Sequence, residues 1–232
     1  MPPAIDLRGA LLALLACVPL AAEVSEAERT ERVQRGLQAL VRIQQEDGGF
    51  QGGTPANAIA GMAFLASGST PVRGEYAEPV RKALRAVLAA QDQASGYLGA
   101  QYGNMYAHGF ATLFLAECYG MAPGDDARNA VEAAIDLIHR SQNAEGGWRY
   151  QPVPVDADIS VTICQVMALR AAYNAGLGGE ASRNAIARAI GYVRRCANGD
   201  GSFSYVANGG GGWGAEGPEG IPRSAAGAMS LI

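Results

Sequence analysis

The stretch Ile-His-Arg-Ser-Gln-Asn-Ala-Glu-Gly-Gly-Trp, residues 138–148, decides the fold because related copies of it occur four times. In each copy an apolar helical segment leads into a polar or small residue, a glycine turn and an aromatic residue. The copies run Leu40-x3-Gln44-x3-Gly48-x-Phe50, Val87-x3-Gln91-x5-Tyr97, Ile138-x3-Gln142-x3-Gly146-x-Trp148 and Val193-x3-Ala197-x3-Gly201-x-Phe203. Their aromatic residues lie 47, 51 and 55 residues apart. A recurrence of this length predicts a repeat architecture.

The segments between the copies alternate between two helical patterns. Residues 80–88, 131–138 and 186–193 are apolar on one side only, which predicts outer helices. Residues 56–67, 106–119, 159–175 and the chain from 223 onward are apolar on most sides, which predicts buried inner helices. Glycines at 68, 120 and 176 are expected to end the first three inner helices. The prediction is an all-α fold of stacked outer–inner hairpins.

The order of the elements places every inner helix directly after a glycine–aromatic turn. The beginnings of all inner helices are therefore expected at one end of the stack. The loops at that end lengthen along the chain, from residues 51–55 to residues 206–221. Long loops over helix N-termini are a common setting for a binding site. We therefore expect the functional site at this rim.

The composition limits the classes of function. The chain has 232 residues, 49% of them hydrophobic and 17% charged, which is typical of a globular protein with a substantial core. A net charge of −4 argues against nucleic acid as a partner.

The first 22 residues are predicted to be an export signal. Arg8 supplies a positive start, residues 10–18 form a short apolar run, and Ala21-Ala22 offers a cleavage site. A lipoprotein signal acylated at Cys17 and a buried N-terminal helix are the alternatives. The apolar run is too short to span a bilayer, so no transmembrane segment is expected. Residues 28–232 are predicted to form one repeat domain, which we expect to be truncated because the last inner helix reaches only Ile232.

The cysteines do not indicate a disulfide framework or a metal centre. Cys118, Cys164 and Cys196 each lie within a helical pattern and are predicted to be small buried residues. The sequence contains no Cys-x-x-Cys motif or Cys/His cluster, so no metal or other cofactor is expected.

The repeated phrase resembles the QW motif of squalene and oxidosqualene cyclases. Arg35-Gly36, Leu40-Val41, Gln45 and Gly48-Gly49-Phe50 match its full form with Phe in place of Trp, and the third copy keeps the Trp as Trp148. The chain after about residue 30 resembles the prenyltransferase and squalene oxidase repeat family, including exported bacterial members. The resemblance implies an α/α toroid.

The same family suggests chemistry for the segment that precedes the third inner helix. Asp156-Ala157-Asp158-Ile159 looks like the Asp-x-Asp-Asp segment of class II terpene cyclases, whose middle Asp protonates an alkene. Asp156 and Asp158 match, but Ile159 replaces the last Asp. Protein prenyltransferases instead hold zinc with an Asp, a Cys and a His. Cys164 lies six residues beyond Asp158 where that pattern needs two, and His108 and His139 are the only histidines in the sequence.

Each candidate residue also has a structural interpretation. Asp156 and Asp158 are either a proton-donating pair or helix N-caps. His108, at the start of the second inner helix, is either a residue that orients a carboxylate or a hydrogen-bonded structural histidine. His139 is expected at the surface.

The aromatic residues divide into two groups by their position relative to the repeat. Phe50, Tyr97, Trp148 and Phe203 are predicted to pack the glycine turns between helices. Tyr102, Tyr106, Tyr150 and Trp213 fall in or beside the rim loops and are candidate ligand contacts.

Three functions remain open at this stage. The leading prediction is an exported toroid that binds a small molecule or acts as a scaffold in the cell envelope, without cyclase chemistry. The first alternative is a class II cyclase-like enzyme that uses Asp158 on an isoprenoid. The second is a carbohydrate-active toroid, since carboxylates and aromatic rings at such a rim also suit sugars.

Overall fold

The computed structural model describes residues 24–99, 103–209 and 220–230. The chain divides into two compact units, Met1–Ala39 and Leu40–Ile232, and the repeats described below lie in the second. The described residues form eight α-helices, one 3-10 turn and no strand, which confirms the all-α prediction. The elements are α2 (Glu26–Ile43), α3 (Thr54–Ala66), α4 (Ala77–Ala89), α5 (Met105–Met121), α6 (Asp125–Ser141), α7 (Ile159–Asn174), α8 (Gly179–Cys196), η1 (Ala207–Gly209) and α9 (Gly220–Ser230).

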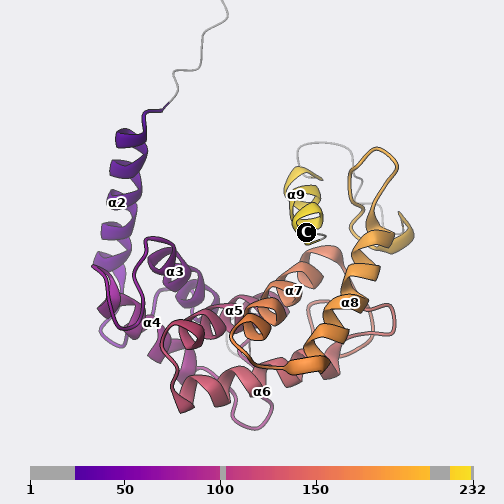
Figure 1. Ribbon diagram of the computed structural model, residues 1–232, viewed down its shortest axis with the longest axis horizontal. Coiled ribbons are helices and arrows are strands. Elements are labelled where there is room, and N and C mark those ends of the chain that lie inside the picture. Colours follow the sequence, from indigo (N-terminus) through magenta and orange to yellow (C-terminus); the bar gives the residue numbers. More distant parts are fainter. Residues whose placement is uncertain (1–23, 100–102, 210–219, 231–232) are drawn as a thin grey trace, which may run out of the picture. The chain divides into compact units, whose positions relative to one another are not determined.

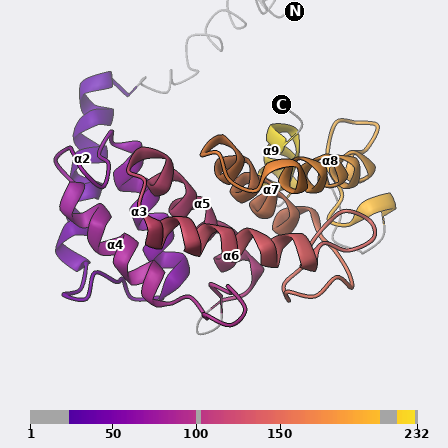
Figure 2. The ribbon, with the colours of Figure 1, turned by 60° about the horizontal axis from the view of Figure 1, so that its bottom comes forward.

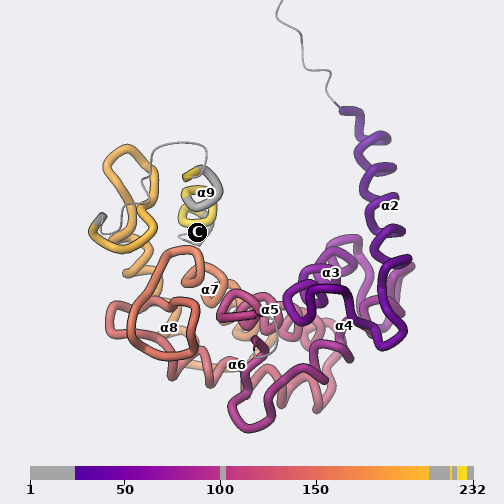
Figure 3. The backbone as a smooth tube through the Cα atoms, turned by 180° about the vertical axis from the view of Figure 1, so that it is seen from behind, coloured from indigo at the N-terminus to yellow at the C-terminus, as the bar shows by residue number. Residues whose placement is uncertain are grey.

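The helices of the second unit alternate between two layers, as predicted. The inner helices α3, α5, α7 and α9 pack one against the next, and α4, α6 and α8 pack against them on one side (Figure 1). The view from behind shows the same order along the chain (Figure 3). When the outer side is turned toward the viewer, α6 crosses in front of α5 (Figure 2).

Burial follows the two sequence patterns. The outer helix α4 buries only Val80, Ala83 and Val87, on one side. The inner helix α5 buries eleven of its seventeen residues. This difference explains why the sequence of α4 is amphipathic, whereas that of α5 is apolar on most sides of the helix.

A glutamine joins each of the first three turns to the following outer helix. Its side-chain amide donates one hydrogen bond to the carbonyl of the turn glycine and one to a carbonyl in the next outer helix. The pairs are Gln44 to Gly48 and Pro79, Gln91 to Gly96 and Ala130, and Gln142 to Gly146 and Ala185, all at 2.8–3.1 Å. We call each such meeting of a turn and the next outer helix a joint.

The turn glycines are required at the joints for two reasons. Gly48, Gly96 and Gly146 all have positive φ, between 75° and 93°. An added Cβ at these glycines would also lie 2.3–2.5 Å from the carbonyl oxygen of Lys82, Ala133 and Arg188, respectively. In the fourth turn Gly201 keeps the positive φ of 85°, but an added Cβ there would meet no heavy atom of the described residues within 4 Å.

A second hydrogen bond ties each turn to its own inner helix. The backbone N–H that follows the turn donates to a polar side chain in the first turns of the helix. The pairs are Phe50 to Asn57, Leu98 to His108, Trp148 to Thr162 and Phe203 to Ser224. The residues of each pair are 7, 10, 14 and 21 positions apart, so the rim loops lengthen along the chain as predicted.

The structure corrects two of the sequence predictions about the fold. In the second repeat it is Leu98, completely buried, that takes the position of Phe50 and Trp148, while Tyr97 is only partly buried. Gly120 does not end its helix, because α5 continues to Met121. Gly68 and Gly176 do follow their helices with φ of 88° and 85°, as expected of C-terminal glycines.

The two conditions on the turn glycines can be separated by mutation. Gly146→Ala combines a strained φ with a collision against the Arg188 carbonyl, whereas Gly201→Ala carries the φ strain alone. We expect a loss of about 1 kcal/mol in the free energy of unfolding for Gly201→Ala and about 3 kcal/mol or more for Gly146→Ala. Urea unfolding of the two variants measures both losses. Equal losses would show that the joint contact adds nothing.

Candidate functional site

Asp158 is the N-cap of α7. Its Oδ1 accepts a hydrogen bond of 2.9 Å from the Val161 N–H, and its side chain is completely buried. Asn104 holds the equivalent position before α5 and accepts from the Tyr106 N–H in the same way. Capping is therefore a property of this position in the repeat, and Asp158 performs it in the third copy.

The second carboxylate oxygen of Asp158 faces a cation. Oδ2 lies 3.9 Å from Nε of Arg149. Burial raises the pKa of the Asp158 carboxyl above its usual range, while the Val161 N–H, the Tyr205 hydroxyl and the charge of Arg149 act in the opposite direction. The site thus contains a carboxyl group that is desolvated but also surrounded by groups that favour its charged form.

Arg149 is the centre of a group of side chains at the rim. Its Nη1 donates to Asp156 Oδ2 at 2.9 Å. Its guanidinium carbon lies 5.4 Å from the ring centre of Tyr150 and 5.9 Å from that of Tyr205, within the range of cation–π attraction. We call the following set the rim cluster: Tyr106, Arg149, Tyr150, Asp156, Asp158 and Tyr205.

The rim cluster is built from successive repeats. The Tyr150 carbonyl accepts from the first N–H of α5, and the Tyr205 carbonyl accepts from the first N–H of α7, both at 3.0 Å. The hydroxyl groups of Tyr150 and Tyr205 are hydrogen-bonded to each other, and the Tyr106 ring lies 6.1 Å from that of Tyr150. Each rim loop therefore closes over the inner helix of the preceding repeat.

The structure brings four of the predicted site residues together and adds two. Asp156, Asp158, Tyr106 and Tyr150 all belong to the rim cluster. Sequence reasoning missed Arg149 and Tyr205. The repeat could have identified Tyr205, because it stands two residues after Phe203 just as Tyr150 stands two after Trp148. Tyr102 and Trp213 lie outside the described residues.

His108 lies apart from this cluster. It is completely buried, its Nδ1 accepts from the Leu98 N–H at 3.2 Å, and its Nε2 donates to the Ala134 carbonyl at 3.1 Å. These two bonds fix the neutral tautomer. The side chain has the same role as Asn57, Thr162 and Ser224 in the other repeats.

His139 is not the surface residue that the sequence suggested. Its side chain is 20% exposed, its Nε2 lies 3.0 Å from Ser182 Oγ, and its Nδ1 lies 3.9 Å from Asp136. The residue types are those of a serine hydrolase triad. Ser182 is completely buried, however, so a substrate cannot reach its hydroxyl in this structure. The contact instead holds α6 against α8.

The three described cysteines are buried free thiols, as predicted. Burial raises the pKa of Cys118 and Cys164 to about 12 and that of Cys196 to about 11, so these thiols are protonated at neutral pH. Among the residues that the structure describes, no group of three or more His, Cys, Asp or Glu side chains could hold a metal ion. No helix in the described ranges is both long and apolar enough to span a membrane.

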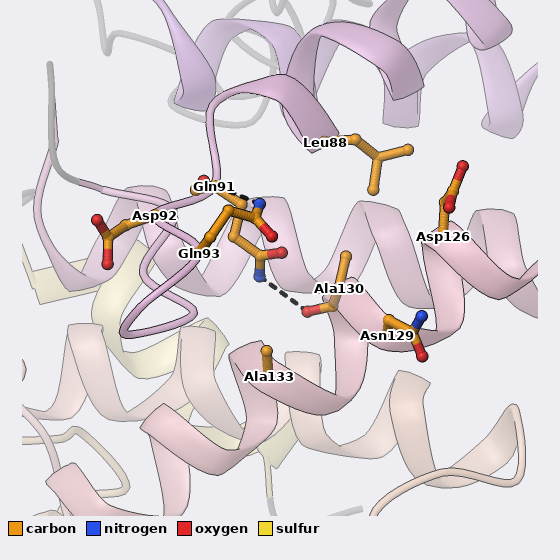
Figure 4. Close-up of a pocket in the computed structure, with 8 residues that line it drawn as sticks. All are labelled: Leu88, Gln91, Asp92, Gln93, Asp126, Asn129, Ala130 and Ala133. Atoms are coloured by element: carbon orange, nitrogen blue, oxygen red, sulfur yellow. Dashed lines mark hydrogen bonds between the residues drawn. The ribbon is translucent and has the colours of Figure 1, made fainter.

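A pocket of about 320 Å³ lies on the outer layer at the second joint (Figure 4). Gln91 crosses it to reach the Ala130 carbonyl, and Asp92 and Asp126 lie on opposite sides of it. Asp92 already accepts hydrogen bonds from the N–H and hydroxyl of Ser95. Gln91 and Asp92, two of the residues that line this pocket, therefore serve the turn.

Alternating inner and outer helices are the arrangement of helical-hairpin repeat proteins, which include both solenoids and toroids. A model of the prenyltransferase alpha-alpha toroid domain matches residues 3–79 and 74–216. The chain therefore belongs to this family, which confirms the resemblance found in the sequence. The comparison with curated proteins gives no match.

The buried histidine gives the fold a pH dependence. Burial lowers the pKa of His108 from 6.5 to about 4, so the folded protein holds this ring neutral where the unfolded chain would protonate it. His108 therefore contributes stability that is fully present above pH 6.5 and is lost as the pH falls toward 4. The full difference corresponds to about 3 kcal/mol.

His108→Gln tests this assignment, because an amide can accept from Leu98 and donate to Ala134 without titrating. The stability of the wild type relative to this variant should fall between pH 6.5 and 4, as measured by urea unfolding at each pH. The comparison removes the contribution of His139, whose pKa is also lowered by burial. A pH-independent difference would contradict the assignment.

Proposed function

We propose that this chain is an exported, ligand-binding member of its family, that the ligand contacts the rim cluster, and that Asp158 acts as a helix cap instead of a proton donor. The cap is the observation that carries the proposal. A carboxylic acid that protonates an alkene must be neutral and must face its substrate. Asp158 is completely buried, its Oδ1 accepts from Val161, and its Oδ2 faces Arg149.

The accessible part of the rim cluster suits a small molecule with both polar and apolar parts. Tyr150 is 38% exposed and stacks on Arg149, which is itself partly exposed. The inner helices also leave large apolar side chains accessible, among them Ile59 on α3 and Met167 on α7. Accessible apolar side chains together with a few oriented polar groups are the usual composition of a small-molecule site. An isoprenoid alcohol has this combination of groups.

One observation favours the cyclase-like alternative. Burial raises the pKa of Asp158, which is the direction that a general acid needs. Arg149 and the cap hydrogen bond oppose that shift. Mutation of Asp158 separates the two roles.

If Asp158 is a cap, Asp158→Asn should change the free energy of unfolding little, because Asn caps about as well and removes a buried charge. Asp158→Ala should cost about 1 kcal/mol. Thermal melting measures both changes. In parallel, product analysis with squalene should show no cyclisation by the wild type. Wild-type turnover that disappears in Asp158→Asn would refute the non-catalytic role.

Binding at the rim is tested directly by titrating the protein with farnesol and measuring the change in its intrinsic fluorescence. Tyr150→Ala should weaken farnesol binding about tenfold, the loss expected from one aromatic contact. Tyr173→Ala is the matched control, since Tyr173 is a similarly exposed tyrosine at the opposite end of α7. Equal affinities of the two variants would place the ligand elsewhere.

The export part of the proposal rests on Arg8 and the short apolar run of residues 10–18. Mass spectrometry of the protein from an exporting bacterium should show loss of at least the first 16 residues. An intact Met1 on a cytoplasmic product would overturn it.

A further inference from the structure

The three joints can be compared position by position, because the turn glycine marks the same place in each. Gly48, Gly96 and Gly146 contact the carbonyls of Lys82, Ala133 and Arg188. Four residues further on, the outer helices carry Ala86, Leu137 and Tyr192. Seven residues further on, they carry Ala89, Arg140 and Arg195.

Large side chains occupy these positions in the second and third joints, whose pockets, of about 320 and 450 Å³, are smaller than that of the first joint. Leu137 and Tyr192 are both buried, and the Tyr192 hydroxyl donates to the Ala157 carbonyl. Arg140 donates to the Ser95 carbonyl, and Arg195 donates to the Glu145 carbonyl. Ser95 and Glu145 each stand immediately before the turn glycine. The second and third joints thus each contain a large apolar or aromatic group and a cation bound to the carbonyl at the turn.

The first joint lacks both groups. Ala86 and Ala89 occupy the two positions, and a pocket of about 710 Å³ opens there. Asp47, which stands immediately before Gly48, lies in its wall. The volume is within the usual range for small-molecule sites. The hollow therefore corresponds to the space that a ring and a cationic arm occupy in the third joint.

The charges around the pocket allow a cation to enter. The Asp47 carboxylate is exposed, and its Oδ1 accepts from the Gly49 N–H. Arg85 also lines the pocket, and its guanidinium lies 3.5 Å from Glu78, a carboxylate that it shares with Arg81. Phe50 and the alanines of α4 provide an apolar wall.

We propose that the first-joint pocket binds a small molecule that carries an aromatic ring and a cationic arm, the ring lying against Ala86 and the cation against Asp47. The pocket shares no residue with the rim cluster, so this proposal goes beyond the function proposed above. The small residues Ala86 and Ala89, where the other joints carry large side chains, account for the larger volume of this pocket.

Benzamidine is a suitable probe, because it joins an aromatic ring to a cation. It should raise the melting temperature of the full chain, and benzoate, which has the same ring and the opposite charge, should raise it much less. The double variant Ala86→Leu/Ala89→Arg, which we call the filled variant, gives the first joint the side chains that the second joint carries. We expect it to weaken benzamidine binding at least about tenfold in a calorimetric titration.

Two controls make the result specific. Ala187→Arg adds the same cation at an exposed position of α8 and should leave benzamidine binding unchanged. The filled variant should also melt no lower than the wild type without ligand, since the new Arg can donate to the Asp47 carbonyl as Arg140 donates to Ser95.

Three results would each overturn the proposal. They are a melting temperature that does not respond to benzamidine, equal responses to benzamidine and benzoate, and unchanged benzamidine binding in the filled variant. A filled variant that melts lower than the wild type would refute the equivalence of the joints on which the proposal rests.

Discussion

The first three repeats of this protein depend on how a tight turn meets the following outer helix. A glutamine amide donates to the turn and to that helix at once, and a glycine lets the turn approach a helix carbonyl closely. Amide groups in such a place must be hydrogen-bonded, because an unpaired buried polar group costs about 1–3 kcal/mol. Apolar packing brings the layers together, but it has little directionality. The joints instead fix the register, that is, the position of each turn along the following outer helix.

This register determines what the rim can present. In each repeat, a polar side chain near the start of the inner helix accepts from the N–H after the turn. His108 and Thr162 are two forms of this one contact. The number of residues between the two partners of this contact differs from repeat to repeat, so the rim loops differ in length. The rim cluster forms where two of the longer loops, which carry Tyr150 and Tyr205, lie side by side.

The sequence was sufficient to predict the alternation of helices, because the period of the repeat and the apolar patterns agree. It placed Asp156, Asp158, Tyr106 and Tyr150 at the rim by repeat position alone. It misplaced Tyr97 because the second copy is irregular, and only the hydrogen bond from Leu98 to His108 shows the true register. Arg149 could not be recognised, since its importance comes from stacking on Tyr205, which lies in another repeat. The contact of His139 with Ser182 was hidden for the same reason.

The joints also explain how one scaffold holds different sites. Side chains at the fourth and seventh positions after the glycine contact are not needed for the register, so they are either large, as in Tyr192 and Arg195, or small, as in Ala86 and Ala89. The joint with the small residues has a larger pocket than the other two. The fourth copy has Ala197 in place of the glutamine, and its turn makes no such bridge within the described part of the chain.

The free energy of unfolding of Gln91→Ala, compared with that of Ala197→Gln, tests the central role of the joints most directly. Gln91→Ala removes two hydrogen bonds at a buried joint and should cost about 2 kcal/mol in urea unfolding. Ala197→Gln adds the same amide to a turn without a following outer helix among the described residues, and should change the stability by less than about 0.5 kcal/mol. A negligible cost for Gln91→Ala would contradict the account.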